Sequence, residues 1–186
     1  MKAWHFVSED CVLRYGDNRL VEAGTYSVDC EPVLCRSGLH ASVKPLDALW
    51  YAPGPVVCRV RMGGYIVVGD DKIAATERTV LWVADISDVL REFARWCAWR
   101  VAHLWSPPRV VTDYLLAGDV SLQDAAWDAA WDAAAWAAAH AAAQDAARVA
   151  AHAAAHAAAR VAAQDAARVA QDRKLSRMLH VVGRSQ

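Results

Sequence analysis

The feature that most constrains this chain is a long run without glycine or proline. Neither residue occurs from Leu122 to Val182, and alanine occupies 28 of these 61 positions. Alanine is the best helix former because it loses no side-chain entropy when the helix forms. The run therefore predicts one helix of about 55 to 60 residues, roughly 80 to 90 Å long. A hairpin of two helices is the alternative, although no turn residue marks a reversal.

The larger side chains of this run predict how the helix is used. They recur every fourth residue from Trp136 to Arg168. Four residues of α-helix turn by about 400°, so the stripe winds around the helix and forms no flat face. Methyl groups make up the remaining surface, and we predict that helices of separate copies pack closely through it. The alternative is a solvated single helix, stabilised by pairs such as Asp145–Arg148.

Tryptophans stand where the alanine run begins. The chain has nine of them, and Trp127, Trp131 and Trp136 open the run. Indole is a large apolar group that is costly to leave in water. We predict that these rings fasten the long helix to the helices before it. An exposed stripe that binds a partner is the alternative.

The first half of the chain has a different pattern. Short runs rich in valine, isoleucine and aromatic residues are bounded by proline, glycine and aspartate, which is typical of strands and turns. These runs are KAWHFV, NRLVEAGTYSV, EPVLC, PVVCRVRM, GYIVVG and RTVLWVAD. Between them, PLDALWYA predicts a short helix, with Pro45 in its first turn. Residues 1–84 are therefore predicted to form a small β-rich domain.

The period changes at Asp85. Apolar residues then recur at helical spacing up to Leu104, with Asp85 or Ser87 as a cap. Pro107 and Pro108 end this helix, and a second short helix runs from Pro108 to Gly118. The prediction is an α+β chain: a β-rich domain (1–84), two connecting helices (85–118), and a long alanine-rich helix with a short tail (119–186).

Charge and cysteine content limit the classes of function. The net charge of −1 gives no electrostatic argument for nucleic acid or an anionic membrane surface, and no apolar run is long enough to span a bilayer. The five cysteines, an odd number without a signal peptide, predict reduced thiols in a cytoplasm. Cys30, Cys35 and His40 are evenly spaced, but no fourth ligand is evident, so buried free thiols are predicted in place of a metal site.

Two resemblances accompany these patterns. EPVLCRSGLHASVKPLDALWYAPG followed by GDDKIAA resembles a family of small uncharacterised domains in bacteriophage and prophage proteins, over roughly residues 1–84. The residues that carry it are 37–41, 45–47, Tyr51 and 69–72. The tail resembles the Asp-Ala-Ala-Trp arrays of actinobacterial and phage proteins. Neither resemblance implies an activity, and the first implies a location in the host cytoplasm.

The stretch GLHAS…DALWYAPGPVVCRVRMGG is also similar, more faintly, to ADP-ribosyltransferases. That resemblance implies His5, Tyr51 and Glu77 as catalytic residues, in the order in which those enzymes carry them. It implies NAD as cofactor, held by Ser37, Gly38 and His40. A carboxylate would stabilise the cation that develops when the nicotinamide–ribose bond breaks. The His-Gly-Ser or His-Gly-Thr signature is absent, since Phe6 and Val7 follow His5.

Two functional interpretations follow. The first is a phage-type accessory protein without a cofactor, which binds an unknown protein target and forms homo-oligomers through its alanine-rich helix. The second is an NAD-dependent ADP-ribosyltransferase with an oligomerising tail. A pocket shared by His5, Tyr51 and Glu77 would favour the second.

Overall fold

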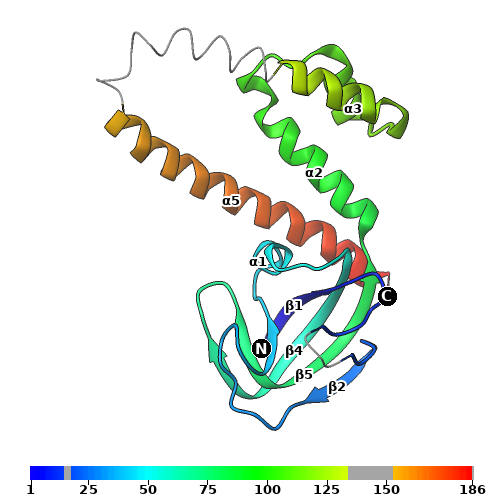
Figure 1. Ribbon diagram of the computed structural model, residues 1–186, viewed down its shortest axis with the longest axis vertical. Helices are drawn as coiled ribbons and strands as arrows, with labels where there is room; N and C mark the ends of the chain where they lie inside the picture. Colours follow the sequence, from blue (N-terminus) through cyan, green and yellow to red (C-terminus); the bar gives the residue numbers. More distant parts are fainter. Residues whose placement is uncertain (15–17, 134–152, 186) are drawn as a thin grey trace. The chain divides into compact units, whose positions relative to one another are not determined.

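The computed structural model describes residues 1–14, 18–133 and 153–185, with side chains from residue 164 onward in the last of these ranges (Figure 1). The chain divides into two compact units. One joins Met1–Leu90 to Gln171–Gln186, and the other is Arg91–Ala170. We refer to the second as the helical unit. An antiparallel sheet followed by helices confirms the α+β organisation.

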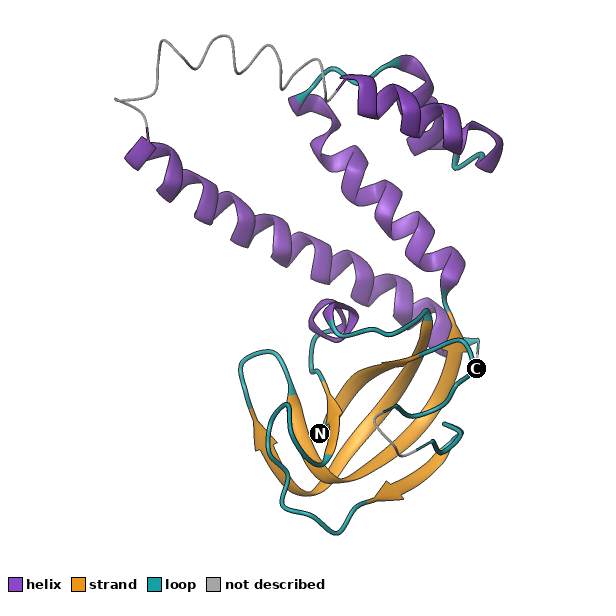
Figure 2. Ribbon diagram, in the orientation of Figure 1, coloured by secondary structure: helices purple, strands orange, loops and turns teal. Residues whose placement is uncertain are grey.

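The sheet of the first unit closes on itself (Figure 2). Its order is β1–β4–β5, and the free edge of β5 then pairs with β3 and β2 in turn. Two backbone hydrogen bonds between Trp4 and Ser42, of 2.8 and 2.9 Å, join the end of β3 back to β1. We call this closed arrangement the barrel. Its strands are β1 (Lys2–Val7), β2 (Gly24–Ser27), β3 (Leu39–Ala41), β4 (Val56–Val68) and β5 (Ile73–Asp85).

The strand β4 combines two runs that the sequence presents separately. Its register against β5 shifts between Gly63 and Ile66. Gly64 has a φ of +65°, and a Cβ there would lie 2.1 Å from the hydroxyl of Thr76. The double glycine is therefore a bulge inside one long strand and does not mark its end. The predicted strand at EPVLC is wrong, because residues 33–37 form a tight turn closed by the Val33–Ser37 bridge.

Apolar side chains fill the barrel. Strand alternation sends one face of β1, β4 and β5 inward, where Val21 and Leu13 of the β1–β2 segment complete the packing. The interior set is Ala3, Val7, Leu39, Ala41, Val56, Cys58, Val60, Met62, Ile73, Ala75 and Val80.

Two helical segments cover the outer face of the sheet. The helix α1 (Pro45–Trp50) has Pro45 at its start, as predicted. The last turns of α5 (Ala153–Arg184) return to the same unit, where Leu175 and Leu179 are fully buried. The ring centroids of His180 and Trp4 lie 6.1 Å apart.

The remaining helices follow the sheet in sequence. They are α2 (Ser87–Val101), the 3₁₀ turn η1 (Ala102–Leu104), α3 (Arg109–Ala117), the 3₁₀ turn η2 (Val120–Leu122), a helix over 123–133, and α5. Asp85 accepts a hydrogen bond from the Ser87 amide, and Gly118 ends α3 in the left-handed region, as predicted. None of the described helices is long and apolar enough to cross a membrane.

The alanine run is seen only in part. Residues 123–133 and 153–184 are helical, whereas Trp136 and the choice between one helix and a hairpin fall outside the described residues. The prediction that Trp127 and Trp131 are core is wrong: they are 71% and 70% exposed. The buried face of the 123–133 helix is instead formed by Ala126, since residues one position apart on a helix point about 100° apart.

Candidate functional site

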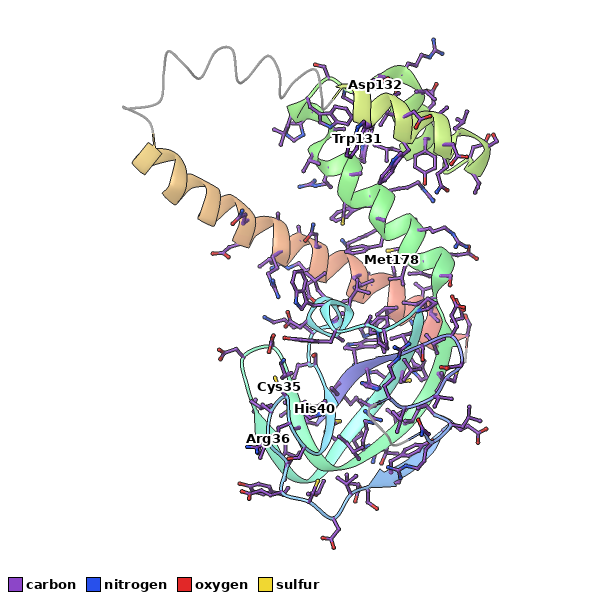
Figure 3. The ribbon with its side chains drawn as sticks, viewed as in Figure 1. Cys35, Arg36, His40, Trp131, Asp132 and Met178 are labelled. Carbon is purple, nitrogen blue, oxygen red and sulfur yellow. The ribbon has the colours of Figure 1, made fainter. Side chains whose placement is uncertain are left out.

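Polar side chains gather at the end of the barrel where the β4–β5 hairpin turns. The Lys72 ammonium donates a hydrogen bond to Cys35 Sγ at 3.1 Å and lies 3.8 Å from the ring centroid of Tyr51. The Tyr51 hydroxyl donates to the carboxylate of Asp71. The ring nitrogen Nε2 of His40 accepts from the Cys35 amide at 3.1 Å. We call these five residues the Cys35 cluster; Cys35 and His40 are labelled in Figure 3.

Backbone geometry places Cys35 against the hairpin. Cys35 has a φ of +62° in the turn 33–37, and Gly38 has a φ of +90°, where a Cβ would lie 2.9 Å from the Cβ of Pro32. At Gly69 a Cβ would lie 2.7 Å from a methyl group of Leu34, so glycine lets the turn approach the hairpin. The Gly69 amide donates to the carbonyl of Lys72, which closes the hairpin beneath the cysteine. Cys35 and Lys72, which lie 37 positions apart in the sequence, are thereby brought into contact.

A cation is held inside the barrel beside this cluster. Arg78 is 1% exposed, and its Nη1 donates to the carbonyl oxygen of His40 at 3.0 Å. Burial, and then the charge of Arg78, lower the pKa of His5 well below its ordinary value. Burial also lowers the pKa of His40 and raises that of the Cys58 thiol to about 12. Burial therefore favours the neutral imidazole of His5 and of the half-buried His40, whose backbone carbonyl meets Arg78.

Lys72, the cation of the Cys35 cluster, lies in a different environment from the buried Arg78. Lys72 is only partly buried, and its hydrogen bonds to Tyr51 and then Cys35 raise the pKa of its ammonium group. Because the ammonium group stays charged through neutral pH, a charged donor faces the Cys35 sulfur. The Tyr51 ring, whose hydroxyl is bound to Asp71, lies against that ammonium group and restricts its position.

The comparison with known families concerns this half of the chain. A DUF7666 domain, a domain of unknown function, covers residues 1–92. No curated protein and no solved structure matches the chain. The matched region contains the whole Cys35 cluster and the barrel, but not the α5 turns that cover the outer face of the sheet. Phage origin, the Asp-Ala-Ala-Trp array and similarity to ADP-ribosyltransferases gain nothing from these comparisons and stay predictions.

The DUF7666 domain brings some of the predicted site residues together. Tyr51 and His40 belong to the Cys35 cluster. His5 lies on β1, where burial, and then the charges of Arg78 and His40, lower its pKa. Ser37 and Gly38 shape the cysteine turn, where the Ser37 hydroxyl donates to the carbonyl of Glu31.

Glu77 does not join this group. It precedes the inward-pointing Arg78 on β5, so its side chain takes the opposite face of the strand. There it is exposed and lies against Gly63, where a Cβ would meet its carboxylate at 3.0 Å. Among the described residues no hydrogen bond or ring contact joins Glu77 to Tyr51, and the catalytic role predicted for Glu77 stays a prediction.

Sequence reasoning missed the residues that complete the cluster. Cys35 was predicted to be a buried thiol and is exposed, as is Cys30. Asp71 and Lys72 lay within a stretch singled out by resemblance alone, and no chemistry was predicted for them. Arg78 gave no signal, because an arginine in a strand is ordinarily read as a solvated residue.

A second surface feature lies in the helical unit. Trp127, Asp128, Trp131 and Asp132 line a shallow surface pocket on the 123–133 helix, where the two pairs recur at a spacing of four residues. Their side chains therefore share one side of the helix. Trp131 and Asp132 are labelled in Figure 3. Exposed tryptophan rings are enriched at protein interfaces, whereas aspartate is depleted there, so the two indoles are the part of this surface that favours an interface.

Proposed function

We propose that this protein is an accessory interaction protein that self-associates through its helical unit, while its DUF7666 domain binds a protein target. The observation that carries the proposal is the exposed pair Trp127 and Trp131 on one helix side. Two indoles left in water are costly, and burial against a partner would recover about 25 cal/mol for each Å² of apolar surface.

Other side chains of the helical unit support the same proposal. Leu104, Leu116 and Val120 are 72%, 66% and 68% exposed. Ala166 and Ala167 of α5 are exposed as well. Exposed apolar side chains gathered within one unit favour association. The net charge of −1 favours a protein partner over nucleic acid or an anionic membrane.

Sedimentation of the full chain tests the proposal. We expect a species larger than the 20.3 kDa monomer at micromolar concentration. The double variant Trp127→Gln, Trp131→Gln should sediment as a monomer, because it removes the indoles and keeps the helix. Trp50→Gln is the matched control, since Trp50 is 80% exposed on α1 of the other unit. A monomeric parent chain, or a double variant that stays associated, would contradict the proposal.

A phage source and a location in the host cytoplasm belong to the same proposal. They rest on the family resemblance carried by residues 37–41, 45–47, Tyr51 and 69–72. The NAD-dependent alternative rests on the resemblance that implies His5, Tyr51 and Glu77 as catalytic residues. The contacts of Tyr51 and His40 within the Cys35 cluster support it.

A further inference from the structure

Cys30 and Cys35 offer a comparison within one loop. Both thiols are exposed and free, five residues apart. Only Cys35 has an ammonium group against its sulfur, with 3.1 Å between Lys72 Nζ and Cys35 Sγ. Within the part of the chain that the structure describes, no cation donates a hydrogen bond to the sulfur of Cys30. The two thiols therefore differ in electrostatic surroundings more than in access.

The ammonium group is held in place by several contacts. The ring centroid of Tyr51 lies 3.8 Å from Lys72 Nζ, and the Tyr51 hydroxyl donates a hydrogen bond to the Asp71 carboxylate. The backbone of Cys35 is fixed from the other side, because its amide donates to His40 Nε2. A hydrogen bond from a fixed cation stabilises a sulfur anion, which is the nucleophilic form of cysteine. Exposed thiols in electropositive surroundings are the ones that oxidants and alkylating agents modify first.

We propose that Cys35 is a peroxide-reactive thiol and that Lys72 activates it. The sulfur anion attacks one oxygen of a hydroperoxide; the S–O bond forms and the O–O bond breaks. The leaving oxygen takes a proton from the Lys72 ammonium and departs as water or an alcohol, and Lys72 regains its proton from solvent. The sulfur is oxidised to sulfenic acid and the peroxide is reduced. This site is independent of self-association through the helical unit.

Competitive alkylation of the full chain tests the activation. With limiting iodoacetamide at pH 7, peptide mass spectrometry reports the rate at each cysteine. We expect Cys35 to react about five- to tenfold faster than Cys30. Lys72→Met should lower the Cys35 rate to that of Cys30 without changing Cys30, whereas Lys72→Arg should keep most of the difference. Equal rates in the parent chain, or no effect of Lys72→Met, would overturn the proposal.

The buried Cys58 monitors folding in the same experiment. Its thiol is fully buried and should stay unmodified in every variant that folds. If Lys72→Met exposes Cys58, the variant Tyr51→Phe tests the activation instead. It keeps the aromatic ring against the ammonium group but loses the hydrogen bond to Asp71. It should lower the alkylation rate of Cys35 by a smaller factor than Lys72→Met. An unchanged rate in that variant would overturn the activation by Lys72.

The oxidation step has its own readout. One equivalent of hydrogen peroxide followed by a cyclic 1,3-diketone should label Cys35 as the trapped sulfenic acid, with less label on Cys30. The label should fall in Lys72→Met by the same factor as the alkylation rate. Absence of the adduct from Cys35, or equal labelling of Cys30, would overturn the assignment to peroxide.

Discussion

Burial and nearby cations set the protonation of two histidines. Burial, and then the charge of Arg78, disfavour a positive charge on His5, while burial, and then the charges of Lys72 and Arg78, disfavour one on His40. Both imidazoles therefore stay neutral in the folded chain at a pH at which they begin to protonate in the unfolded chain. The interior chemistry thus makes the stability depend on pH.

We expect the free energy of unfolding to fall as the pH drops below about 6.5, the ordinary value for histidine. In that range the unfolded chain binds protons that the folded chain does not, so stability rises with pH, by up to about 1.4 kcal/mol per pH unit for each imidazole. Urea unfolding between pH 7.5 and 5 measures this slope. His5→Gln should make the slope shallower, and an unchanged slope in that variant would show that His5 protonates as freely in the folded chain.

Tyr51 also tests the NAD-dependent alternative. If the cluster holds NAD, millimolar NAD should raise the melting temperature, since a ligand of the folded state stabilises it by mass action. Tyr51→Ala should abolish the increase, while Glu77→Gln should keep it, because Glu77 lies against Gly63 and contributes no side chain to the Cys35 cluster. The absence of any increase in the parent chain would remove this alternative.

The site residues show what a sequence can and cannot predict. Tyr51 and His40 could be singled out because they lie within distinctive short motifs. The contact between Cys35 and Lys72 could not, since it depends on how the β4–β5 hairpin closes and on the missing side chain at Gly69. Burial of Arg78 follows from a change of strand face at a bulge, which no local pattern of polarity reveals.

At the scale of elements, the end of α5 is what holds the outer face of the sheet. Leu175 and Leu179 are fully buried, and a Cβ at Gly183 would lie 2.7 Å from the Trp82 ring. The Asp172 carboxylate accepts a hydrogen bond from the Leu46 amide at 3.2 Å. Because the N-cap residue Lys44 makes no side-chain hydrogen bond, Asp172 of α5 caps the first turn of α1. The two covering helices thus support each other.

Leu179→Ala should therefore destabilise the protein. Deleting a fully buried leucine side chain costs about 2 to 5 kcal/mol, depending on how far the site collapses. Val181→Ala is the control two residues along, since Val181 is 67% exposed and should change the free energy of unfolding little. Denaturant unfolding monitored by tryptophan fluorescence measures both. Equal effects would mean that the end of α5 does not pack as described.

Elements with strong local signals were predictable. Three helices could be predicted from local signals: α1 from Pro45 at its start, α2 from its apolar period, and α3 from Gly118 at its end. The segment EPVLC could not be predicted correctly, because its residues are typical of a strand but form part of the turn 33–37. The docking of residues 171–186 was also missed, since Leu175 and Leu179 carry the spacing of any amphipathic helix and say nothing of which surface they bury.

At the scale of the whole molecule, the first unit is discontinuous in sequence. The DUF7666 match ends at residue 92, yet the last 16 residues pack on the same sheet. A chain ending at Ala170 should therefore melt at a lower temperature and bind a hydrophobic dye such as ANS, because Trp4 and the outer sheet face lose their cover. Calorimetry and dye fluorescence check this. A shortened chain as stable as the parent would show that the barrel needs no cover.

This discontinuity has a consequence for how the chain is made. The ribosome delivers residues 1–90 well before residues 171–186, which complete the same unit. At about 5 to 20 residues per second, the 80 residues between them take about 4 to 16 s to synthesise. During that interval the outer face around Trp4 and Trp82 stands open on the nascent chain. Every copy therefore passes through a stage at which a chaperone, or the finished α5 of a neighbouring copy, can reach that face before its own helix does.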